Sequence, residues 1–198
     1  MDVLEVRMKK FILCSLFVLT GCSTTSGIKV IEQSDSKPSW ASITHPVSEE
    51  GGKMRFVGYF TSDGDSRPSA LIHGSGTKAM AMPLESISDD FLQQSGVAED
   101  MRESSAKLII STLRKNPPTI PGLQVTGNYY ERVEIQGTDG TIKSELRAFS
   151  LAECPVGEYN QAKHEALERL KGDPKIQKEL DSIMSDQRGR NYKTAEAK

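Results

Sequence analysis

The amino-acid sequence predicts an α+β fold: a three-stranded antiparallel sheet with helices packed on one face, followed by C-terminal helices. Residues 54–60 have the aromatic, partly alternating pattern of a strand, and residues 123–136 and 141–151 alternate apolar and polar side chains around a turn at 137–140. Between these strands, residues 68–115 carry apolar side chains at helical spacing. Strands and helices in this order are typical of α+β domains.

The chain starts with a pattern typical of an export signal. A basic pair is followed by a short apolar run from Phe11 to Leu19. A helix that spans a bilayer needs about 20 apolar residues, so this run is too short to anchor the chain by crossing the membrane. We therefore predict that residues 1–21 are a signal peptide, with Met1 and Met8 as alternative starts.

The end of this apolar run resembles the lipobox of bacterial lipoproteins, with Leu19, Thr20 and Gly21 before Cys22. In such proteins a lipid is attached to the cysteine thiol, and the chain is then cut just before that cysteine. The residues before the cut must be small, as Thr20 and Gly21 are. The resemblance implies lipidation of Cys22. Ser23, in place of an aspartate, implies sorting to the outer membrane, with the domain facing the periplasm.

The charge balance excludes one class of partner. Removal of residues 1–21 takes away three of the 25 basic and two of the 27 acidic residues, which leaves a formal charge of −3. A nucleic-acid-binding domain would carry a clustered excess of basic residues. We expect no nucleic-acid partner. The expected partners are the membrane, through the lipid, and other envelope proteins or a second copy of the chain.

After lipidation of Cys22, the only free thiol downstream of the cut is Cys154. A single thiol cannot form an intramolecular disulfide, so the domain must be stabilised by its core. Burial of Cys154 is the favoured interpretation, and pairing with another chain is the alternative.

The composition divides the rest of the chain into four segments. Residues 22–37 are rich in Ser, Thr, Gly and charged residues, and are predicted to be a flexible lipid tether. Residues 38–171 are predicted to form the α+β domain and residues 172–187 a C-terminal helix. Residues 188–198 are polar without periodicity, which predicts a disordered tail.

Within the domain, glycine and proline mark the first strand and the first helix. Gly58 inside the strand indicates a close approach of another backbone or a bulge. Pro68 fits the first turn of a helix, and Pro83 is expected to kink or end that helix. Residues 89–94 would then form a separate short helix.

The later helices have clearer signals. Residues 99–115 are amphipathic, with acidic residues at the start and basic residues at the end, and two prolines follow directly. Residues 155–170 are also helical, and Asp173 and Pro174 fit the N-cap and first position of the last helix. That helix has an apolar seam formed by Ile176, Leu180, Ile183 and Met184. We expect the seam to pack on its own domain, and a partner helix is the alternative.

No pattern indicates a catalytic, metal or cofactor site. The three histidines, His45, His73 and His164, are scattered without metal-ligand spacing. Ser75 lies between Gly74 and Gly76, but matches neither a nucleophile elbow nor a phosphate loop, and a helix packed closely on a sheet is the favoured explanation. A calcium loop is less favoured than solvated loops for the carboxylates Asp63, Asp65, Asp89 and Asp90. A carbohydrate-stacking platform is less favoured than contacts with the core for the aromatic residues Trp40, Tyr129 and Tyr130.

Several short motifs follow the lipobox in a characteristic order. They are Pro38-Ser39-Trp40, Phe56-Val57-Gly58 with an alanine-bearing helix after it, Ile120-Pro121-Gly122-Leu123-Gln124-Val125, and the Asp139-Gly140 turn between two strands. Over roughly residues 38–170 the chain thereby resembles the twenty-kilodalton membrane-associated lipoprotein family (LPP type), which includes the flagellar assembly lipoprotein FlgP. The resemblance implies a small α+β domain that works by protein assembly at the outer membrane, in some members around the flagellar motor. It supplies no catalytic residues.

Three functions therefore compete. The favoured one is a non-enzymatic structural or assembly lipoprotein on the periplasmic face of the outer membrane. The second is an envelope binding or regulatory module that contacts peptidoglycan or a cell-wall enzyme. The third, least favoured, is a hydrolase that uses Ser75.

Overall fold

A computed structural model describes residues 27–196, with only the backbone described for residues 104 and 188–196. In chain order, the elements are β1 (Ile28–Gln33), β2 (Val47–Glu50), β3 (Lys53–Asp63), α1 (Pro68–Gln94), α2 (Glu99–Lys115), β4 (Gln124–Gln136), β5 (Ile142–Pro155), α3 (Val156–Gly172) and α4 (Pro174–Glu196). The α+β class is confirmed. The sheet, however, has five antiparallel strands in the order β1-β4-β5-β3-β2, so the prediction of three strands was wrong.

The predicted hairpin forms the centre of the sheet. Strands β4 and β5 pair from Gln136↔Ile142 at the turn to Gln124↔Glu153 at the far end. Strand β3 pairs with the other edge of β5 over its whole length. Strand β5 lies between β3 and β4, and its middle residues are buried on both faces, against α1 on one face and against residues 40–41 on the other.

Both unpredicted strands lie at the edges of the sheet. Strand β1 pairs with β4 and occupies part of the predicted tether, so the flexible-tether prediction for 22–37 was wrong for Ile28–Gln33; residues 22–26 lie outside the described part. Strand β2 forms a hairpin with β3 through Gly51 and Gly52, whose φ values of 59° and 75° suit the tight turn that joins such strands.

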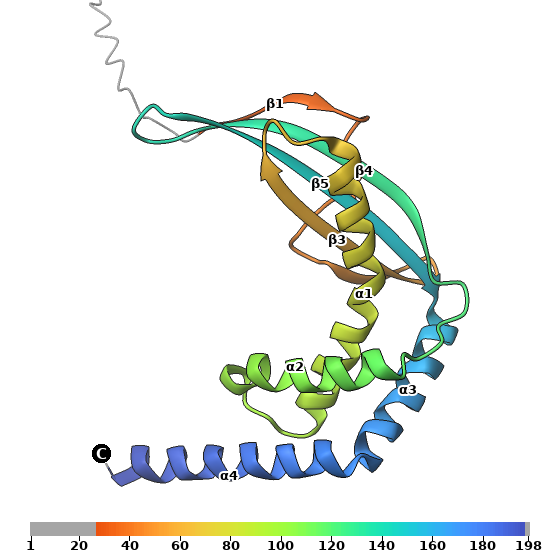
Figure 1. Ribbon diagram of the computed structural model, residues 1–198, viewed down its shortest axis with the longest axis vertical. Helices are drawn as coiled ribbons and strands as arrows, with labels where there is room; N and C mark the ends of the chain where they lie inside the picture. The colour runs from red at the N-terminus through yellow and green to blue at the C-terminus, as the bar shows by residue number, and fades with distance from the viewer. Residues whose placement is uncertain (1–26, 197–198) are drawn as a thin grey trace, which may run out of the picture.

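One face of the sheet is covered by α1 (Figure 1). This helix starts with Pro68 as predicted, but runs unbroken for 27 residues. The helix therefore does not end at Pro83, and the prediction of a separate helix at 89–94 was wrong. Buried residues lie on both sides of Pro83, including Ala79 and Phe91, so packing along the whole helix outweighs the helix-breaking tendency of proline.

Gly58 explains how closely α1 approaches the sheet. A Cβ atom at this position would overlap the Ser75 carbonyl oxygen and the Ala79 nitrogen of the helix. The predicted close backbone approach at Gly58 is confirmed, and no larger residue fits without moving α1 away from β3.

Helices α2, α3 and α4 continue the core beyond the end of the sheet (Figure 1). The seam of α4 is buried against this core: Ile176 is 1% exposed and Leu180 9%. The packing of the seam on its own domain is confirmed. Asp173 accepts a hydrogen bond from the Lys175 backbone at 2.8 Å, as an N-cap should. Since α4 continues to Glu196, the disordered tail predicted for 188–198 was wrong for 188–196.

Candidate functional site

The predicted lipidation site lies outside the described residues. Cys22 and the preceding Leu19, Thr20 and Gly21 belong to the part for which no structure is described. The described chain begins with Gly27, five residues after Cys22.

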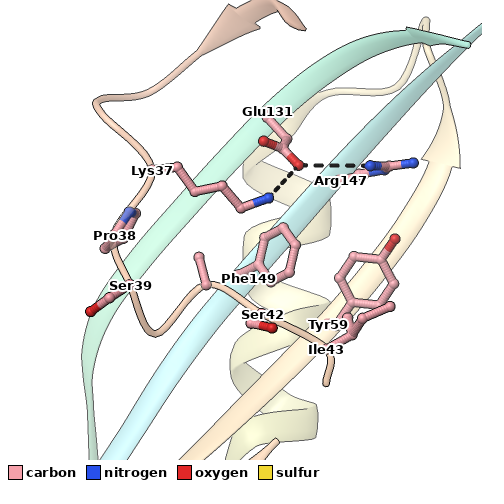
Figure 2. Close-up of a pocket in the computed structure, with 10 residues that line it drawn as sticks. Lys37, Pro38, Ser39, Ser42, Ile43, Tyr59, Glu131, Arg147 and Phe149 are labelled. Carbon is pink, nitrogen blue, oxygen red and sulfur yellow. Dashed lines mark hydrogen bonds and ion pairs between the residues drawn. The ribbon is translucent and has the colours of Figure 1, made fainter. Parts of the chain in front are cut away.

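The structure presents a candidate site on the sheet face opposite α1, which we call the open face. Residues 34–46, here the crossing segment, run over this face between β1 and β2. A groove of about 510 Å³ lies between the crossing segment and the sheet. Figure 2 shows the groove; its lining includes Lys37, Ile43, Tyr59, Glu131, Arg147 and Phe149.

The carboxylate of Glu131 is the centre of the groove's charged end. Strand β4 places it on the open face, where the residue is only 3% exposed. Lys37 donates a hydrogen bond from Nζ to Oε1 at 2.9 Å, and Nη1 of Arg147 lies 3.8 Å from the same oxygen (Figure 2). A buried carboxylate needs such partners, because an unpaired charge away from water costs several kcal/mol.

Tyr129 completes the environment of Glu131. Its hydroxyl donates to Oε2 of Glu131 at 3.0 Å, so both carboxylate oxygens have a partner. Burial, together with the hydrogen bond and the negative charge of Glu131, raises the pKa of Tyr129 to about 12. The phenol therefore stays neutral and serves as a hydrogen-bond donor.

Aromatic rings form the floor of the groove. The ring of Phe149 lies 4.8 Å from that of Tyr59 and 6.0 Å from that of Tyr129, measured between centroids. The ammonium group of Lys37 lies 5.1 Å from the centroid of Phe149. Lys37 thus contacts both a carboxylate and an aromatic face, and fixes the crossing segment onto the sheet.

A second charged cluster lies on the open face near the end of β5. Glu153 accepts hydrogen bonds from Arg55 at 2.9 Å, Lys53 at 3.2 Å and Thr126 at 3.1 Å. Burial alone would raise the pKa of Glu153, but the hydrogen bonds from these three residues outweigh it and lower the pKa. Arg55 also forms an ion pair with Glu50, so two cations face two anions in this cluster.

The aromatic residues considered for carbohydrate stacking belong to the core. Tyr129 is 1% exposed, and the partly buried Trp40 of the crossing segment packs against the same apolar cluster. Tyr130 lies on the other face and packs near Leu71 of α1. The prediction that these rings contact the core is confirmed.

Ser75 lies in the interface between α1 and the sheet. It is fully buried; its hydroxyl donates to the Ile72 carbonyl at 3.0 Å and lies 2.7 Å from the Ser150 hydroxyl on β5. The neighbouring Gly74 and Gly76 face Phe60 and Ser150 of the sheet. The packing explanation for this serine–glycine run is confirmed.

The remaining candidates do not gather into a site. His45, His73 and His164 are exposed and belong to different elements. Of the four carboxylates, Asp90 forms an ion pair with Lys163 at 3.1 Å, and Asp63, Asp65 and Asp89 are exposed. Within residues 27–196, no group of three or more His, Cys, Asp or Glu side chains could hold a metal ion.

Cys154 lies on the α1 side of β5 and is 2% exposed, so its predicted burial is confirmed. Burial raises the pKa of the Cys154 thiol, which keeps it in the less reactive protonated form.

The groove itself was not predicted from the sequence. Lys37 and Glu131, which form the ion pair at its charged end, are 94 residues apart in the sequence. Because Glu131 has both oxygens engaged, its geometry suits the positioning of the crossing segment better than proton transfer. The groove is open to solvent between the crossing segment and the rings of Tyr59 and Phe149.

Comparisons with known proteins give no match: neither a protein-family model, nor a curated protein, nor a solved structure is similar to this chain. Among the helices of residues 27–196, none has the length and apolar character required to cross a bilayer.

Proposed function

We propose that the protein is a lipoprotein of the bacterial cell envelope, anchored in the outer membrane by lipid on Cys22 and facing the periplasm, where it has a structural or assembly role. The observation that carries the proposal is the order of signals at the start of the chain. Two lysines, a short apolar run and Leu19-Thr20-Gly21-Cys22 follow one another without interruption. A chain attached by several buried acyl groups would stay at the membrane, since each buried methylene contributes about 0.8 kcal/mol.

Such an anchor would hold the domain close to the bilayer. Five residues from Cys22 to Gly27, even fully extended, reach roughly 18 Å. Strand β1 follows at Ile28. This distance is shorter than the one expected for a flexible tether that extended to residue 37.

The charged groups of the open face support a structural role in protein assembly rather than a catalytic role. Glu131 and Glu153 are both buried, and cationic or hydroxyl groups hold them in place. Interfaces that assemble proteins need such a rigid surface, whereas acid–base catalysis needs a group free to exchange protons. The family resemblance makes association with the flagellum one form of this role.

Replacement of Cys22 tests the anchor. Cys22→Ser should abolish labelling with a palmitate analogue, leave the signal peptide attached, and remove the acylated peptide from mass spectra. Cys154→Ser is the matched control, because it removes the other downstream thiol and should leave lipidation unchanged. Unchanged acylation in the Cys22→Ser protein would refute the proposal.

Replacement of the next residue tests the location. Ser23→Asp should shift the protein from outer-membrane to inner-membrane fractions, while Ser23→Ala should stay with the outer membrane. If wild-type protein already fractionates with the inner membrane, the outer-membrane part of the proposal fails.

A second candidate function, an envelope binding or regulatory module, is favoured by the groove on the open face. Ile43 lines this groove and is 61% exposed, so Ile43→Asp should reduce capture of a partner or sedimentation with purified sacculi without harming the fold. Leu108→Asp is the control, because Leu108 lies on α2, away from the groove, and is 36% exposed. Equal binding by both variants and the wild type would exclude the groove as the binding site.

A further inference from the structure

One end of the sheet extends beyond α1, where β1 begins and β4 turns into β5 (Figure 1). We call residues 27–31 and 134–143 at this end the hairpin arm. It carries four exposed large apolar side chains: Ile28 at 60%, Val30 at 45%, Ile31 at 44% and Ile142 at 66% exposure. Isolated exposed apolar residues are ordinary, but a group of four on one projecting end indicates a contact surface.

The apolar side chains of the arm lie on both faces of the sheet. Ile28 pairs with Ile135, and Ile135 pairs with Lys143, so these three residues share a face. Ile142, the neighbour of Lys143 in β5, points to the opposite face. The arm is thus an apolar wedge. A protein partner on one face would leave the other in water, whereas a lipid surface can surround both.

Charges on the arm cancel. The cations are Lys29 and Lys143, and the anions are Glu134 and Asp139. Asp139, at the turn, accepts hydrogen bonds from the backbone and side chain of Thr141, which holds its carboxylate within the turn. A neutral wedge with a charged tip suits the boundary between headgroups and acyl chains, where apolar faces are buried by about 5–10 Å.

The proposed anchor at Cys22 favours a lipid surface as the occupant. Gly27 is the first residue of the arm and lies five residues after Cys22. If lipid on Cys22 holds the chain, Gly27 at the start of the arm must lie within roughly 18 Å of the bilayer. We infer that the hairpin arm rests on the lipid surface and inserts its isoleucine side chains at the headgroup–acyl boundary. This inference rests on the proposed lipid anchor.

Fluorescence of the lipidated full-length protein in vesicles tests the inference. An environment-sensitive fluorophore is attached to Ile142→Cys, and the matched control carries it at Leu108→Cys on α2, at the far end of the molecule (Figure 1). Cys154 is buried and Cys22 would be blocked by lipid, so each variant has one accessible thiol. The vesicles contain phosphatidylcholine, with or without phosphatidylglycerol, and lipids with a nitroxide near the headgroup.

The probe at position 142 should show blue-shifted emission and strong nitroxide quenching in both lipid mixtures, because the contact is apolar. The probe at position 108 borders the apolar seam of α4, so its emission should stay the same when vesicles are added and should show no quenching. Emission at position 142 that vesicles leave equally unchanged would overturn the inference. A blue shift that appears only at high protein density would overturn it in favour of a second copy of the chain.

Flotation of the unlabelled wild-type protein distinguishes a missing lipid anchor from a missing contact between the arm and the lipid surface. Protein that does not float with vesicles lacks the anchor, and the proposed function fails. Protein that floats, with a water-exposed probe at position 142, keeps the anchor and refutes only the contact of the arm.

Discussion

Lys37 Nζ and Glu131 Oε1 lie 2.9 Å apart, although 94 residues separate them in the chain. The lysine belongs to the crossing segment and the carboxylate to the middle of β4. Their side chains are 46% and 4% exposed, so a partly solvated cation covers a buried anion. This contact attaches the N-terminal segment of the domain to the centre of the sheet.

Lys37→Met should therefore lower the free energy of unfolding by about 1–2 kcal/mol, since it leaves a buried carboxylate with fewer partners. Lys171→Met is the control, because both side chains of the Lys171–Glu168 ion pair are exposed. This pair should contribute less than about 0.5 kcal/mol to the free energy of unfolding. Urea unfolding measures both. Equal losses would mean that the buried position of Glu131 does not strengthen the contact.

Gly58→Ala should destabilise the domain by about 3 kcal/mol or more, because the added methyl group meets backbone atoms of α1 that cannot rotate away. Gly157→Ala makes the same change in α3, where nothing lies within 4 Å of the new atom. It should stabilise the helix by up to about 1 kcal/mol. A Gly58→Ala protein that unfolds at the wild-type denaturant concentration would contradict the close packing of α1 on β3.

The pKa of Tyr129 gives an expectation at high pH. Its value is raised from 10.0 to about 12, so the folded state keeps the phenol proton after the unfolded chain has lost it. The resulting stabilisation is complete below pH 10 and is lost as the pH rises toward 12. Tyr129→Phe should lose less stability than the wild type across this range. Parallel pH profiles for the two proteins would exclude this role for Tyr129.

Cys154 should react with a thiol reagent only after unfolding, because it is buried and its pKa is raised. The measurement compares labelling in buffer and in denaturant. In the control variant Leu108→Cys, the exposed thiol should react rapidly in buffer. Rapid labelling of Cys154 in the folded protein would show that β5 is accessible from the α1 side.

Local patterns in the sequence were sufficient to predict the central hairpin and α2. Each has a strong period and a clear end, such as the prolines after Lys115. Strand β1 lacks this signal because all six of its residues are exposed, so no alternation marks a buried face. For β2, the Gly51-Gly52 dipeptide was the available signal.

Features that depend on distant residues could not be predicted. Helix α1 continues past Pro83 because it packs on the sheet and on helices later in the chain. The groove needs the crossing segment to meet β3, β4 and β5, and no local pattern specifies which strands a segment will cross. In contrast, the burial of Cys154 followed from the ordinary preference of free cysteine for the core, and the close packing around Ser75 followed from the glycines on either side of it.

The start of β1 and helix α4 lie at opposite ends of the molecule (Figure 1). A chain held at its N-terminal end would use the sheet as a rigid spacer and present α4 on the side remote from its attachment. Partners that bind α4 would then be held at a fixed distance from the point of attachment, set by the length of the domain.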